Sequence, residues 1–73
     1  MATRVLDLKG LQCPQPQLKM TIEIQSMHHG DILEAIADCD SFEDDVRGWA
    51  ARTHKVILWF RNEDSGKRCQ VRV

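Results

Sequence analysis

The chain has 73 residues, enough for one small domain around a single hydrophobic core. Apolar residues make up 42% and charged residues 29%, a balance typical of a folded globular protein and not of a disordered chain. The net charge of −1 argues against direct nucleic-acid binding, because nucleic-acid-binding domains are usually basic. We therefore expect residues 1–73 to form one domain.

The number of cysteines and the N-terminal residues indicate in which cellular compartment the protein works. Three cysteines with no Cys-x-x-Cys pair do not resemble the even disulfide framework of a small secreted domain. The N-terminus runs into a strand pattern without the apolar core of a signal peptide, and no stretch approaches the roughly 20 apolar residues of a membrane span. The sequence therefore predicts a cytoplasmic protein with no membrane partner.

The first half of the chain reads as a strand followed by a helix. Alternating apolar residues predict a strand over residues 5–8, and Gly10 marks the next loop. Helical spacing predicts a helix over residues 14–27, with Gly30 as its left-handed stop. Spacings of three and four place five residues on one helix stripe that should face a sheet: Cys13, Pro16, Met20, Ile24 and Met27.

The second half supplies a strand, a helix and two further strands. Strands are predicted over residues 32–37, 54–61 and 68–73. The helix should begin near residues 40–41, where Asp40 with Glu43, or Ser41 with Asp44, has capping-box spacing. The order β-α-β-α-β-β predicts an α+β fold, a two-layer sandwich with a four-stranded mixed sheet and two helices on one face.

Cys13 is the residue with the clearest chemical role. It precedes Pro14 at the start of the predicted helix, and proline favours the first helical position because it lacks an N–H. The free backbone N–H groups and the positive end of the helix dipole favour an anion there, so we expect a lowered pKa for this thiol. A buried cysteine is the alternative, but a thiol before two prolines is poorly suited to a core.

The run Gly10-Leu11-Gln12-Cys13-Pro14-Gln15-Pro16 resembles the signature of the TusA family of small sulfur-carrier proteins, also described as SirA-like or YedF-like. Further similarity lies at Leu6-Asp7, Gly30-Asp31, Ala37-Asp38 and Val46-Arg47-Gly48-Trp49, so the resemblance covers nearly the whole chain. Two positions depart from the family pattern: Cys39 stands where an Asp-Pro run is common, and Thr53 precedes His54 where glycine is frequent.

The resemblance implies a sulfurtransferase that acts as a carrier. Cys13 would accept sulfane sulfur as a persulfide, Gly10, Pro14 and Pro16 would shape its loop, and Asp7 would be the nearby acidic residue. A cysteine desulfurase or a rhodanese would donate the sulfur, and a downstream protein would accept it in tRNA thiolation, molybdenum-cofactor supply or sulfur oxidation. A monomer suits this role, and no cofactor is implied.

Two further features leave alternatives open. The loops after the first two strands should meet at one sheet edge, so Cys39 could be a second thiol, although a small residue filling the turn is the favoured interpretation. Leu18 and Ile22 could form a partner docking patch or be ordinary surface residues. The alternatives to a carrier are a regulatory interaction module and a redox sensor built on Cys13 and Cys39. The histidines match no zinc spacing, so no metal is expected.

Overall fold

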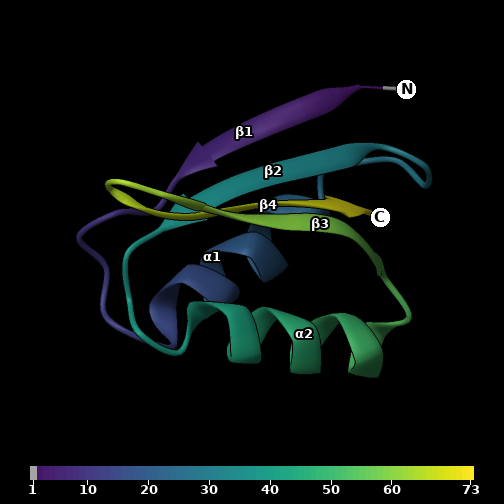
Figure 1. The fold of residues 1–73 in the computed structure, drawn as a ribbon. Helices are drawn as coiled ribbons and strands as arrows, with labels where there is room; N and C mark the ends of the chain where they lie inside the picture. The colour runs from purple at the N-terminus through teal and green to yellow at the C-terminus, as the bar shows by residue number, and fades with distance from the viewer. Residues whose placement is uncertain (1) are drawn as a thin grey trace.

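The computed structural model describes residues 2–73, which fold into two layers (Figure 1). Their elements, in chain order, are β1 (Thr3–Asp7), α1 (Gln15–Ile24), β2 (Ile32–Ala37), α2 (Phe42–Thr53), β3 (Val56–Glu63) and β4 (Gly66–Arg72). The described strands form one sheet in the order β1-β2-β4-β3, with β1 and β2 parallel and the other pairs antiparallel. Helices α1 and α2 cover the same face, so the predicted α+β sandwich is confirmed.

The parallel pairing of β1 and β2 determines where the loops meet. Thr3 pairs with Ile32 and Asp7 with Ile36, so both strands end at the same edge of the sheet. The Leu8 N–H extends this pairing by donating to the Ile36 carbonyl at 2.7 Å. The β1–α1 and β2–α2 connections therefore start side by side (Figure 1).

The core lies between the sheet and the helices. Met20 of α1 is fully buried, as are Leu33 and Val71 of the sheet, while Trp49 of α2 is 2% exposed. The remaining fully buried large side chains are Pro16, Phe42, Val46 and Cys69. Burial of each large apolar side chain contributes about 1.5–3 kcal/mol, so this layer carries most of the stability of such a small domain.

Helix α1 is shorter than predicted. It ends at Ile24, not at Met27, because the amides of Gln25, Ser26 and Met27 donate to carbonyls three residues back, which tightens the last turn. Met27 still packs against the core. Gly30, with φ +94°, lies in the turn before β2, so its predicted role as the helix stop is wrong.

The predicted capping box of α2 is also wrong. Ser41 is the N-cap residue, but its hydroxyl donates to the Asp45 carboxylate at 2.9 Å, and within the described part of the chain it accepts no capping hydrogen bond from a backbone N–H. At the other end His54 adopts the left-handed conformation, with φ 58°, and turns the chain into β3. The strand therefore begins at Val56 and not at residue 54.

The described chain ends meet at the α1–β2 connection. The Ala2 N–H donates to the Asp31 carboxylate at 3.1 Å, and the Val73 N–H donates to the Asp31 carbonyl at 2.9 Å. The Gly30 N–H in turn donates to the Val73 carbonyl at 2.6 Å. This end of the molecule lies on the right of Figure 1, opposite the β1–α1 loop.

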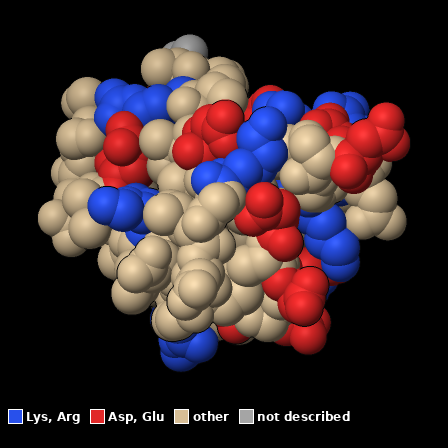
Figure 2. Space-filling model, turned by 90° about the vertical axis from the view of Figure 1, so that its left-hand side faces the viewer, with Lys and Arg blue, Asp and Glu red and all other residues tan. Residues whose placement is uncertain are grey.

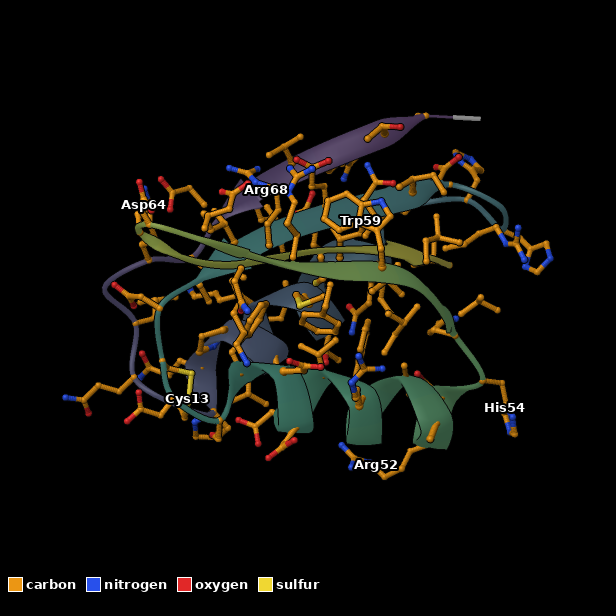
Figure 3. All side chains as sticks on the ribbon, viewed as in Figure 1. Cys13, Arg52, His54, Trp59, Asp64 and Arg68 are labelled. Atoms are coloured by element: carbon orange, nitrogen blue, oxygen red, sulfur yellow. A yellow bond between two sulfur atoms is a disulfide. The ribbon has the colours of Figure 1, made fainter. Side chains whose placement is uncertain are left out.

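The sheet face opposite the helices carries an ion network. Arg68 of β4 donates to Glu34 at 2.8 Å and to Glu63 at 3.1 Å, and Gln70 donates to Glu34 at 2.7 Å. The hydrogen bond from Gln70, followed by that from Arg68, lowers the pKa of Glu34. Trp59 lies on the same face with Arg61 stacked over its ring (Figure 3).

Candidate functional site

Cys13 and Cys39 are joined by a disulfide in this structure (Figure 3). Cys13 comes from the β1–α1 loop and Cys39 from the β2–α2 loop, which begin side by side at the sheet edge. Their Cα atoms are 5.8 Å apart, within the range that a disulfide requires. The favoured interpretation of Cys39 was a small residue that fills a turn, whereas the structure bonds it to Cys13.

The pair borders an open depression of about 570 Å³ on the surface. Its lining consists of the two loops alone: Gly10, Leu11, Gln12, Cys13, Asp38, Cys39, Asp40 and Ser41. Figure 2 looks onto this end of the molecule, where uncharged surface adjoins acidic side chains. Because the depression is shallow and open, another protein could reach the sulfur atoms within it.

A hydrogen bond joins the two loops independently of the disulfide. The Gly10 N–H donates to the Asp38 carboxylate at 3.0 Å, and Gly10 has a φ of +86° that favours glycine. Asp7 accepts the Lys9 N–H at 3.1 Å and so shapes the start of the loop. Asp38 is thus the acidic residue that links the loops, a role the sequence analysis missed.

The amides near Cys13 differ from the prediction. Helix α1 begins at Gln15, with Pro14 as its N-cap and Pro16 as its second residue. The two prolines have no N–H, and the Gln15 N–H donates to the Gln12 carbonyl at 2.8 Å. The three positions after Cys13 therefore offer no free amide to a thiolate, and the helix dipole contributes only about 0.3–1 kcal/mol to its stabilisation.

A carboxylate completes the group of reactive atoms. Each sulfur of Cys13 and Cys39 and a carboxylate oxygen of Asp45 lie within 4.8 Å of one another. The Ser41 hydroxyl orients the Asp45 carboxylate at 2.9 Å. Cysteine binds metal ions as the thiolate, so these three side chains could act as metal ligands only after the disulfide is reduced.

The other candidate residues lie elsewhere. Cys69 of β4 lies fully buried in the core, and burial raises the pKa of its thiol to about 12. Leu18 and Ile22 are 50% and 63% exposed on α1, so a docking patch there stays a prediction. His54 lies at the far end of α2 from Cys13 (Figure 3).

Comparison with known proteins identifies the family. The family described as Sulfurtransferase TusA matches residues 4–73, nearly the whole chain and both loops of the depression. The chain belongs to the TusA family. This confirms the resemblance drawn from the Gly-Leu-x-Cys-Pro-x-Pro motif, and TusA membership supports a role in carrying sulfur.

Several TusA relatives have names that contain the words "sulfur carrier protein". One from Halobacterium salinarum is 39% identical over 56 residues, covering 77% of this chain and 69% of the relative. One from Neisseria meningitidis serogroup A is 30% identical over 64 residues, covering 88% and 86%. One from Aquifex aeolicus is 34% identical over 61 residues, which are 84% of this chain but only 31% of that longer protein.

The described helices are also too short and too polar to cross a membrane.

Proposed function

We propose that this TusA-family protein carries sulfane sulfur as a persulfide on Cys13 and passes it to an acceptor protein. The observation that carries the proposal is the position of the motif cysteine, partly exposed at the rim of an open depression. The family and the names of the relatives support the same role. A cysteine desulfurase or a rhodanese is the proposed donor.

The transfer requires the reduced form of the protein. A thiol reductant first reduces the Cys13–Cys39 disulfide. A reducing compartment such as the cytoplasm would supply this reductant. The Cys13 thiolate then attacks the outer sulfur of the donor persulfide, a new S–S bond forms on Cys13, and the donor thiolate leaves. An acceptor thiolate repeats this attack on the outer sulfur and restores the Cys13 thiolate.

The partners supply most of the activation in this scheme. The two prolines and the bonded Gln15 amide leave Cys13 with little stabilisation from its own helix. An open depression without a deep cleft also leaves the donor and acceptor active sites to orient the sulfur. A carrier of this kind works by presenting its cysteine and not by a complete catalytic apparatus of its own.

Mass spectrometry after loading tests the proposal. Reduced protein incubated with a rhodanese and thiosulfate should gain about 32 Da, the mass of one sulfur atom. Cys13→Ser should fold normally and gain nothing, whereas the control Cys69→Ala should gain sulfur like the wild type, since Cys69 is buried. Sulfur bound to the Cys13→Ser variant would refute the assignment.

A redox sensor is the second candidate, because the structure contains the Cys13–Cys39 disulfide. A sensor would form this bond with mild oxidant and would not accept sulfur from either donor. Persulfide loading of the reduced wild type therefore favours the carrier, and disulfide formation without any loading favours the sensor.

A further inference from the structure

A persulfide on Cys13 would stand next to a second thiol. The two Cα atoms lie 5.8 Å apart, and the sulfurs are directly bonded in the oxidised state. The hydrogen bond from Gly10 to Asp38 and that from Leu8 to Ile36 connect the same two segments without using either sulfur. We expect these bonds to keep Cys39 close to Cys13 after reduction as well.

We propose that Cys39 is a resolving thiol that releases the carried sulfur as sulfide. This inference rests on the proposed function, because it needs a persulfide on Cys13. It adds an activity to the carrier, the reduction of sulfane sulfur to hydrogen sulfide. The disulfide seen in this structure is then the product state of that reaction.

The step balances without an external oxidant. The Cys39 thiolate attacks the Cys13 Sγ, a bond forms between the two cysteine sulfurs, and the bond from Cys13 Sγ to the outer sulfur breaks. The electron pair leaves with the outer sulfur, which takes the proton lost by Cys39 and departs as HS⁻. The Cys39 sulfur is oxidised, the outer sulfur is reduced, and a thiol reductant later regenerates both cysteines.

The geometry favours attack on Cys13 Sγ over attack on the outer sulfur. The observed bond shows that Cys39 Sγ reaches Cys13 Sγ from within the paired loops. The outer sulfur would extend into the open depression, from which the small HS⁻ ion can leave. Transfer to a partner and release as sulfide thus compete for the same loaded state.

The surrounding charge favours release. A carboxylate oxygen of Asp45 lies within 4.8 Å of both sulfurs, and Asp38 and Asp40 line the same depression. These negative charges disfavour a persulfide anion held among them. The disulfide product carries no charge, so its formation relieves the repulsion.

A single-turnover experiment tests the inference. Reduced protein is loaded anaerobically with rhodanese and thiosulfate, separated from donor and reductant, and then followed by intact mass and by a methylene blue assay for sulfide. The wild type should lose about 34 Da, the mass of hydrogen sulfide, end about 2 Da below the dithiol mass, and release stoichiometric sulfide. In Cys39→Ser the persulfide should survive at least about tenfold longer, because the neighbouring attacking group is gone.

The controls separate failure of this inference from failure of the carrier function. Cys69→Ala should release sulfide as the wild type does, and Cys39→Ala, with circular dichroism on both Cys39 variants, guards against an effect of misfolding. Equal sulfide release by the wild type and Cys39→Ser overturns the resolving role and leaves the carrier intact. Sulfur found on Cys39 overturns it too, since Cys39 would then be a relay. Absence of loading on every variant with an intact Cys13 overturns the carrier itself.

Discussion

Gly66 supports the reactive loop from the β3–β4 hairpin. It has a φ of +150°, a conformation that side chains rarely adopt, and it pairs with Glu63 at the start of β4. A Cβ atom added there would overlap the Ala37 carbonyl oxygen and stand 3.0 Å from the carbonyl carbon and 3.3 Å from the Asp38 Cα. We therefore predict that Gly66→Ala destabilises the domain and displaces the segment that leads into Cys39.

The predicted loss in the free energy of unfolding of Gly66→Ala has two parts. The unfavourable φ costs about 1–2 kcal/mol, and pushing backbone atoms apart in a packed region costs about 1–3 kcal/mol more. The free energy of unfolding should thus fall by about 2–5 kcal/mol, a large part of the roughly 5 kcal/mol expected of a small domain. Gly30→Ala is the matched control, since Gly30 has a φ of +94° but no atom within 4 Å of the added Cβ.

Urea unfolding followed by tryptophan fluorescence measures both variants. Gly30→Ala should lose only the conformational part, about 1–2 kcal/mol. The difference between the variants isolates the overlap with Ala37. If the two agree within about 0.5 kcal/mol, the steric argument for Gly66 is refuted.

Three further predictions concern the core, the ion network and the buried thiol. Met20→Ala, which empties a fully buried site, should cost about 2–5 kcal/mol in urea unfolding, and a loss below about 1 kcal/mol would contradict its central place in the core. The folded-state pKa of Glu34 lies below its ordinary value of 4.5. The contribution of Glu34 to the free energy of unfolding is therefore complete above the ordinary pKa and should disappear as the pH falls through the folded-state pKa. Urea midpoints from about pH 6 to about pH 3 should fall less steeply in Arg68→Ala, and equal slopes would exclude the hydrogen bonds from Arg68 as a cause. Iodoacetamide should alkylate the reduced loop cysteines of the native protein but Cys69 only after unfolding, because burial raises its pKa to about 12, and labelling of native Cys69 would contradict that burial.

The fold was largely predictable because its periodicities are strong. Alternation in the strands and the three-and-four spacing of Pro16 and Met20 depend on which side chains are buried, and the structure buries those positions. Helix ends were predicted less well. The end of α1 depends on three tightened hydrogen bonds after Ile24, which no residue type in that segment requires.

The two cysteines of the site were predictable from the sequence, but the acidic side chains around them were not. The motif identified Cys13, and the β-α-β topology allowed Cys39 to lie nearby, but only coordinates give the 5.8 Å between their Cα atoms. The lack of an N–H at Pro14 and Pro16 could have been read from the sequence, but the bond from the Gln15 N–H to Gln12 could not. The position of Asp45 beside the sulfurs could not be predicted from the sequence, because it depends on how α2 packs against the rest of the domain.

The position of the described chain ends affects how this domain can be combined with others. Ala2 and Val73 are both tied to Asp31, on the side of the sheet away from the cysteine pair. A polypeptide fused to either end would extend away from the depression and leave it accessible to a visiting enzyme. In the Aquifex aeolicus relative the matched segment makes up 31% of a longer protein, an arrangement that this placement of the described chain ends would accommodate.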